Sequence, residues 1–206
     1  MQGTIDNQTG DSYDSAIHRR RSIRLQKYDY TQAGAYSVTL CTMDRTYLFG
    51  EVVSGEMRLN EYGQAVQTEW LQTAHVRPNI ELDTFVIMPN HVHGILVIID
   101  AVGATWMSST RRTITDIRRA VSYTHLRAPT TEQFGKPVVG SLPTIVRSFK
   151  SAATKRINAV RGTPGMAVWQ RTYYEHIIRN DDDLRRVREY IANNPAAWLD
   201  DECHLG

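Results

Sequence analysis

The segment from His91 to Ile99 limits the possible folds more than any other part of the chain. It reads His-Val-His-Gly-Ile-Leu-Val-Ile-Ile and follows a Pro-Asn pair that is typical of a turn. Apolar residues occupy both odd and even positions, whereas a strand with one face in water would alternate apolar and polar residues. The segment therefore predicts a strand in the middle of a sheet, with helices packed on at least one side.

Two histidines stand at the start of this predicted strand. Residues i and i+2 of a strand point to the same face, so His91 and His93 are expected to project side by side. Two imidazoles held in this way can bind one metal ion. Spacing alone leaves an alternative open, in which one ring is a hydrogen-bonded core histidine and the other faces solvent.

Apolar periodicity and turn residues predict the elements around this strand. We expect strands at 35–42, 84–88 and 168–178, and helices that start at the cap Asn60, at Leu142 and at the cap Asn180. The helices should end near Pro78, at Gly162 and at Pro195. This order, βαββαβ with an extra C-terminal helix, predicts an α+β fold: a ferredoxin-like sandwich with an antiparallel sheet.

Length and local composition predict the domain organisation. A chain of 206 residues corresponds to one domain plus tails. We expect a basic N-terminal arm at 1–30, a folded domain at 31–200 and a tail at 201–206. Within the domain, residues 100–141 lack a sustained period and predict a variable, partly disordered insertion. Residues 120–129 read like a translated sequencing adaptor, so they are assigned no function.

Composition excludes several classes of protein. Hydrophobic residues make up 41% of the chain, which is ordinary for a globular protein with a core. No apolar run approaches the roughly 20 residues that span a bilayer, and the N-terminus has no signal-peptide core. Cys41 and Cys203 are far apart and suggest no disulfide framework. We therefore expect a cytoplasmic protein without a membrane partner.

Positive charge is clustered, although the formal net charge is only +2. Four arginines fall within six residues of the arm: Arg19, Arg20, Arg21 and Arg24. Such an arm often tracks phosphates, and a merely solvated basic segment is the alternative. The helix that starts at Leu142 has an apolar stripe running to Val160, and the cations Arg147, Lys150 and Lys155 lie largely opposite it. An ordinary solvated helix face is the alternative there.

Tyr190 and Asn194 lie four residues apart and should share a face of the last helix. A tyrosine oxygen can attack phosphorus when a metal polarises the phosphate, and an asparagine oxygen can be a neutral third ligand beside two imidazoles. Taken alone, the spacing leaves both as ordinary residues: Tyr190 at the edge of the core and Asn194 as a C-terminal cap.

Seven motifs in order along most of the chain resemble one known family. They are Arg21–Leu25, Tyr28–Tyr30, Gly50–Val53, Met88–Gly94, Val168–Arg171, Tyr173–Asn180 and Glu189–Pro195. Together they are similar to the REP-associated tyrosine transposases, relatives of the small single-strand transposases in the HUH nuclease superfamily.

This resemblance implies a function and a set of site residues. Tyr190 would be the nucleophile, and His91, His93 and Asn194 would hold a divalent cation, Mg²⁺ or Mn²⁺. The implied activity is cleavage and rejoining of single-stranded DNA near hairpins through a 5′-phosphotyrosine intermediate. The protein would act as a monomer or homodimer at the bacterial nucleoid. DNA would be held by Arg19, Arg20, Arg21, Arg24, Arg147 and Lys150.

Two other functions remain open from the sequence. One is a domesticated protein of the same fold that binds hairpin DNA without transposing. The other is a metal-dependent phosphodiesterase that uses water, with Tyr190 in a structural role. A covalent protein–DNA adduct would separate the favoured function from both.

Overall fold

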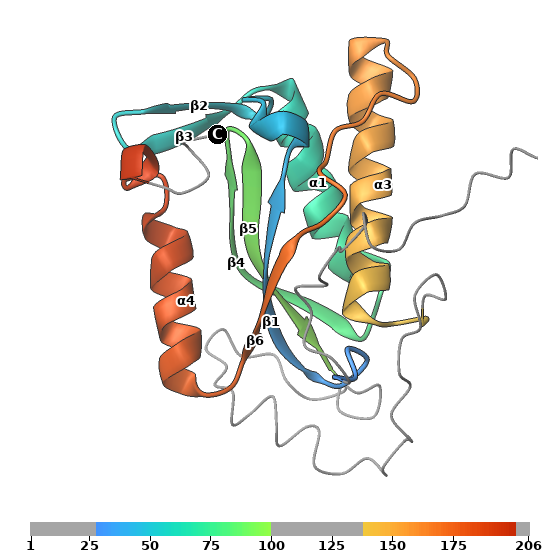
Figure 1. Cartoon of the computed structure of the whole chain (residues 1–206), viewed down its shortest axis with the longest axis vertical. Helices are drawn as coiled ribbons and strands as arrows, with labels where there is room; N and C mark the ends of the chain where they lie inside the picture. The colour runs from blue at the N-terminus through green and yellow to red at the C-terminus, as the bar shows by residue number, and fades with distance from the viewer. Residues whose placement is uncertain (1–27, 100–137, 201–206) are drawn as a thin grey trace, which may run out of the picture.

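A computed structural model describes residues 28–99 and 138–200 of the chain. Its main sheet has the strand order β4-β5-β1-β6, and every neighbouring pair is antiparallel (Figure 1). The strands are β1 (Gly34–Cys41), β4 (Ile80–Met88), β5 (His91–Ile98) and β6 (Tyr174–Ile178). The helices are α1 (Glu61–His75), α3 (Leu142–Arg161) and α4 (Asp181–Asn193). In chain order these elements give βαββαβ and a terminal helix, so the predicted ferredoxin-like fold is confirmed.

The strand β5 is buried on both faces, as its sequence predicts. Val92, Leu96 and Ile98 join the core beneath α1 and α3, whereas Ile95 and Val97 pack with residues of α4. Figure 1 shows the corresponding layers, with α1 and α3 on one side of the sheet and α4 on the other. Because side chains alternate along a strand, odd-numbered residues of β5 face α4. The two histidines therefore lie under the last helix.

The helix ends follow the residues that predict them. The side chain of Asn60 accepts hydrogen bonds from the backbone N–H groups of Tyr62 and Gly63, both at 3.0 Å. Gly162 ends α3 in the left-handed conformation at φ 66°. The apolar stripe of α3 is shorter than predicted, because Val160 in the last turn is half exposed. In the described ranges, no helix is long and apolar enough to cross a membrane.

The predicted fourth strand, 168–178, is wrong in its first half. Regular pairing with β1 covers only residues 174–178, and before it Trp169 makes an isolated bridge to Thr42. The backbone there still follows the end of β1, because the N–H of Met43 donates to the carbonyl oxygen of Val168 at 2.8 Å and the N–H of Gln170 donates to that of Cys41 at 3.0 Å. The Trp169 ring packs into the core, 5.7 Å from the ring of Phe149. The register against β1 shifts between Trp169 and Tyr174, so residues 171–173 interrupt the predicted strand.

A small hairpin lies outside the predicted order of elements. Strands β2 (Gly50–Val53) and β3 (Glu56–Leu59) pair with each other, joined by Ser54 and Gly55 at φ 55° and 79°. Positive φ at both central residues is typical of the tight turn that matches strand twist. The sequence pattern does not predict this hairpin, because four-residue strands are too short to show a clear alternation.

The boundary of the predicted N-terminal arm also needs correction. Asp29 and Tyr30 are buried, and Tyr30 belongs to the core cluster beneath α1 and α3. The carbonyl oxygen of Tyr30 accepts a hydrogen bond from the N–H of Leu142 at 3.0 Å, at the start of α3. The folded domain therefore includes residues 28–30. Residues 1–27, which carry the four arginines, lie outside the described part, as does most of the predicted insertion at 100–141.

Gly94 is expected to be essential for packing α1 against the sheet. A Cβ added there would lie 2.3 Å from Cζ2 of Trp70, a fully buried ring of α1. We predict that Gly94→Ala lowers the free energy of unfolding by about 1–3 kcal/mol through overpacking. Urea denaturation would measure this loss. Gly34→Ala is the control, because the nearest atom to its added Cβ is 3.7 Å away; equal stability of both variants would contradict the prediction.

Candidate active site

His91 and His93 form a buried pair at the start of β5. Their exposed fractions are 0% and 4%, and their ring centroids lie 4.4 Å apart at an interplanar angle of 73°. The predicted side-by-side arrangement is therefore present. The alternative in which one ring faces solvent is wrong, since both rings are covered.

Each imidazole is held at its Nδ1 atom. Nδ1 of His91 lies 2.8 Å from Oδ1 of Asn90, and Nδ1 of His93 lies 2.8 Å from Oγ1 of Thr39. Thr39 is the residue directly opposite His93 in β1, so strand register places this partner. Both contacts leave Nε2 as the ring nitrogen that is directed away from the supporting strands.

Tyr190 brings the last helix to the histidine pair. Its hydroxyl oxygen lies 3.3 Å from Nε2 of His93, and the two ring centroids are 5.1 Å apart. The tyrosine side chain is 52% exposed, although the histidine beneath it is buried. Part of Tyr190 is therefore open to solvent while the histidines remain covered.

Asn194 lies in the segment that crosses the histidine pair. Four residues before it, Tyr190 contacts His93, and four residues after it, the Trp198 ring lies 5.9 Å from the ring of His91. Asn194 itself is 2% exposed and caps α4, with its N–H directed to the carbonyl oxygen of Ile191 at 3.4 Å. Asn194 is thus a buried C-terminal cap, and its predicted role as a metal ligand stays untested.

The donor set at this place fits a divalent cation. Two imidazole nitrogens and one amide oxygen are all neutral ligands, which leaves the charge of a cation available to phosphate oxygens. Mg²⁺ and Mn²⁺ both favour oxygen ligands, which the amide of Asn194 and the phosphate would supply beside the two imidazoles. Among the residues that the structure describes, no group of three or more His, Cys, Asp and Glu side chains could hold a metal ion. A metal site at the histidine pair would therefore depend on the amide oxygen of Asn194 as its third protein ligand.

An ion pair fastens α4 to the sheet two residues before Tyr190. The guanidinium of Arg188 donates to both carboxylate oxygens of Asp83 in β4, at 2.8 and 2.5 Å. Burial tends to raise the pKa of Asp83, but hydrogen bonds from Arg188 and Thr84 outweigh burial and hold this pKa below its ordinary value of 3.8. The pair fixes the helix that carries the tyrosine.

The Asp83–Arg188 pair predicts a loss of stability in acid. A carboxyl group whose pKa is lowered by folding stabilises the protein above its ordinary pKa and loses that effect as pH falls through the lowered value. We expect Asp83→Asn to reduce the free energy of unfolding by about 1–2 kcal/mol at pH 6 and by progressively less as the pH falls below the ordinary pKa of 3.8. Urea titrations across this range would measure it. Arg185→Gln, which removes the exposed pair with Asp182, is the control and should change little.

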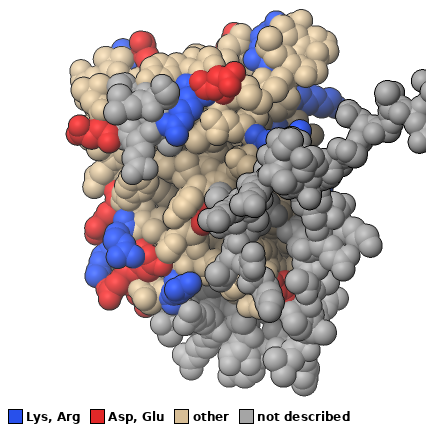
Figure 2. Space-filling model, viewed as in Figure 1, with Lys and Arg blue, Asp and Glu red and all other residues tan. Residues whose placement is uncertain are grey.

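The outer surface of α4 carries charges of both signs (Figure 2). Its acidic first turn is followed by arginines, and Arg185 and Arg186 pair with Asp182 and Asp183 at 2.6 and 2.7 Å. A mixed surface of this kind does not concentrate positive potential. It therefore offers no basic patch for a polyanion beside the tyrosine.

The predicted cations of α3 have different surroundings. Arg147 is exposed, whereas Nζ of Lys150 donates to the carbonyl oxygens of Gln170 and Thr172 at 2.9 and 3.1 Å. Lys150 thus holds the loop before β6, and its charge is partly engaged by the protein. The DNA-binding prediction stays untested for both residues, and Arg19, Arg20, Arg21 and Arg24 lie outside the described residues.

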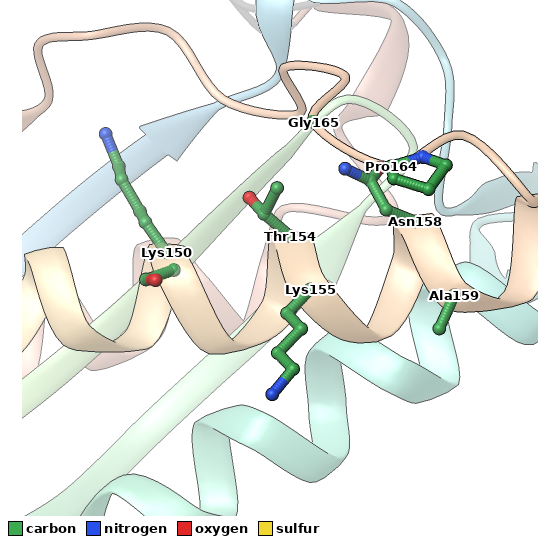
Figure 3. Close-up of a pocket in the computed structure, with 8 residues that line it drawn as sticks. Lys150, Thr154, Lys155, Asn158, Ala159, Pro164 and Gly165 are labelled. Carbon is green, nitrogen blue, oxygen red and sulfur yellow. The ribbon is translucent and has the colours of Figure 1, made fainter.

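A surface cavity of about 570 Å³ lies along α3, away from the histidines. Figure 3 shows Asn158 beside Pro164 and Gly165, with Lys150 and Lys155 pointing in different directions from the helix. Because α3 and α4 cover opposite faces of the sheet, this cavity is not part of the tyrosine–histidine site. Its lining includes no histidine, cysteine or carboxylate.

Sequence patterns missed several residues of the site. Thr39 could be found only from the register of β1 against β5, and the Asp83–Arg188 pair joins residues 105 positions apart. Trp198 had one detectable signal, since it continues the four-residue spacing of Tyr190 and Asn194 beyond Pro195. Each of these residues depends on tertiary packing more than on local pattern.

Comparison with known proteins relates the chain to transposases. No family model matches it. A Haemophilus influenzae protein named "Uncharacterized protein" is 37% identical over 194 residues, which cover 94% of this chain and 97% of that protein. Another H. influenzae protein, named "Putative REP-associated tyrosine transposase", is 25% identical over 167 residues, covering 81% of this chain and 73% of that protein.

A solved structure of a REP-associated tyrosine transposase bound to a REP hairpin is 18% identical, with a TM-score of 0.48; the match covers 85% of this chain and 73% of that one. The family relation rests on the sequence relatives alone. The chain therefore belongs to one family with the uncharacterized H. influenzae protein and resembles the REP-associated tyrosine transposases.

Proposed function

We propose that this protein cleaves and rejoins single-stranded DNA through a covalent link to Tyr190. The observation that carries the proposal is the position of the tyrosine hydroxyl, 3.3 Å from Nε2 of His93 and beside the buried pair that His93 forms with His91. An accessible phenol next to a candidate metal site is the arrangement that nucleophilic attack on a phosphodiester requires.

The proposed reaction exchanges one phosphoester bond for another. The phenolic proton of Tyr190 leaves to solvent, and the phenolate oxygen attacks the phosphorus in line with the leaving oxygen. The bond from phosphorus to the 3′ oxygen breaks, and that oxygen takes up a proton to become a 3′-OH. The other fragment stays joined to Tyr190 through its 5′ phosphate. Attack by a 3′-OH reverses these steps and rejoins DNA without ATP.

His91, His93 and Asn194 would hold a divalent cation, Mg²⁺ or Mn²⁺, at this place. When bound, the ion would stabilise negative charge on the reacting phosphate. The protein's own contribution is to keep two neutral imidazoles buried and fixed at Nδ1, so that neither ring has to reorient during the reaction. Neutral ligands suit this task because they do not repel the phosphate.

The proposed substrate is single-stranded DNA next to a hairpin. This part of the proposal rests on the resemblance to REP-associated tyrosine transposases, and the basic arm supports it. Arg19, Arg20, Arg21 and Arg24 would track the phosphate backbone, with Arg147 as a further contact. Lys150 is the weaker candidate because two carbonyl oxygens of the protein already accept from its ammonium group.

A strand-labelled oligonucleotide tests the proposal. The full chain is incubated with Mn²⁺ and a hairpin followed by a single strand, labelled at either the 5′ or the 3′ end, and run on a denaturing gel. We expect the 3′ label to migrate with the protein and the 5′ label to appear as a shorter free fragment. Two free fragments without an adduct would indicate a water-using phosphodiesterase. A bound but uncut hairpin would indicate the domesticated binding protein.

A further inference from the structure

The turn that precedes the histidine pair is unusually well fixed. Pro89 and Asn90 join β4 to β5, and both are buried, although such turns normally lie at the surface. The carbonyl oxygen of Pro89 accepts from the N–H groups of Leu48 and Phe49 at 2.8 and 2.9 Å. The carbonyl oxygen of Asn90 accepts from the N–H and the hydroxyl of Thr42 at 2.8 and 3.0 Å. The segment after β1 therefore anchors the turn.

The side chain of Asn90 is oriented at both ends. Its Nδ2 donates to the carbonyl oxygen of Arg45 at 3.2 Å, which distinguishes the amide nitrogen from the amide oxygen. The turn that supplies this carbonyl, Met43–Arg45, holds Asp44 and Arg45 at φ 52° and 51°, a costly backbone conformation for residues other than glycine. Oδ1 is thereby directed to Nδ1 of His91, 2.8 Å away.

This contact determines which nitrogen of His91 carries the proton. An amide oxygen only accepts hydrogen bonds, so Nδ1 of His91 must be the donor. In a neutral imidazole with Nδ1–H, Nε2 holds the lone pair that a metal ion needs. Free histidine in water favours the opposite tautomer, with the proton on Nε2. Asn90 can therefore select the ligating form of the ring before any ion arrives.

We propose that Asn90 is a positioning residue that holds His91 in the Nδ1–H tautomer and so prepares Nε2 to bind a divalent cation. The metal part of this inference rests on the proposed function, whereas the tautomer is a property of the protein by itself. Partners that orient metal-binding histidines typically change metal affinity by 10–100-fold when removed. Asn90→Ala should therefore weaken binding of Mn²⁺ by roughly 10-fold or more.

Two measurements on the full chain test the inference. Ring ¹⁵N chemical shifts of metal-free protein report the tautomer of His91, and electron paramagnetic resonance of free Mn²⁺ reports the affinity. We expect Nδ1–H in the unaltered protein, and in Asn90→Ala a shift toward Nε2–H with weaker Mn²⁺ binding. An Nε2–H ring in the unaltered protein would overturn the inference without any variant, even if Asn90→Ala fails to fold.

Thr42→Val is the matched control. It removes the hydroxyl that donates to the backbone of Asn90 but leaves the contact between Asn90 and His91 in place. A merely structural role of the turn predicts that both variants weaken Mn²⁺ binding equally, and that result would refute a positioning role. A wild-type protein with the expected tautomer and Mn²⁺ affinity but no DNA adduct would instead refute the proposed function and leave this inference intact.

Discussion

Replacing Tyr190 by phenylalanine is expected to abolish covalent attachment to single-stranded DNA while hairpin binding stays nearly unchanged. Phenylalanine keeps the ring that packs 5.1 Å from His93 and removes only the hydroxyl oxygen that would attack phosphorus. Since the lost group is the nucleophile, the decrease in adduct should reach the detection limit of the assay. The measurement is the amount of 3′-labelled DNA that migrates with the protein on a denaturing gel.

Tyr174→Phe is the matched control for this experiment. Tyr174 is a similarly exposed tyrosine, at 59%, but it lies at the start of the edge strand β6 and not in α4. Its loss should leave the adduct unchanged. If Tyr190→Phe forms as much adduct as the unaltered protein, another tyrosine must be the nucleophile, and Tyr173 and Tyr174 are the next residues to replace.

Loss of either histidine is expected to reduce DNA cleavage by orders of magnitude. His91→Ala and His93→Ala each remove one of the two imidazoles at the candidate metal site, so both the ion and the phosphate would be misplaced. A chelator should abolish DNA cleavage by the unaltered protein, and added Mn²⁺ or Mg²⁺ should restore cleavage. Cleavage rates with and without each ion would be measured on the labelled hairpin substrate.

His75→Ala controls for a general effect of removing a histidine. His75 is exposed at the end of α1, on the side of the sheet opposite α4, and its replacement should not affect cleavage. Because His91 and His93 are buried, hairpin binding and thermal melting should be recorded for each variant to show that it folds. Full cleavage in the presence of a chelator would contradict the metal-dependent function.

Hydrophobic pattern predicted the parts of the fold that depend on local periodicity. The apolar run after His91 places β5 in the sheet, and the caps Asn60 and Asn180 locate the starts of α1 and α4. Period-2 alternation also placed His91 and His93 on one face. These features could be predicted because each depends on neighbours within a few residues.

The features that could not be predicted depend on contacts between distant segments. Residues 168–178 have a strand-like sequence throughout, but the register against β1 shifts between Trp169 and Tyr174 and interrupts the strand. Lys150 reads as a free cation of a helix face, yet the loop before β6 places two carbonyl oxygens beside it. The meeting of Tyr190 with His93 joins residues 97 positions apart. No local pattern reports such contacts.

The double role of α4 links chemistry to the completion of folding. The helix that carries Tyr190 also supplies Leu184 and Ile191 to the core over Ile95 and Val97. While α4 is still inside the ribosome, the emerged part of the chain contains the histidines. It lacks both the tyrosine and the helix that covers this face of the sheet. Under the proposed function, DNA cleavage could therefore not begin before the fold is finished, and products truncated before α4 should be inactive and prone to degradation.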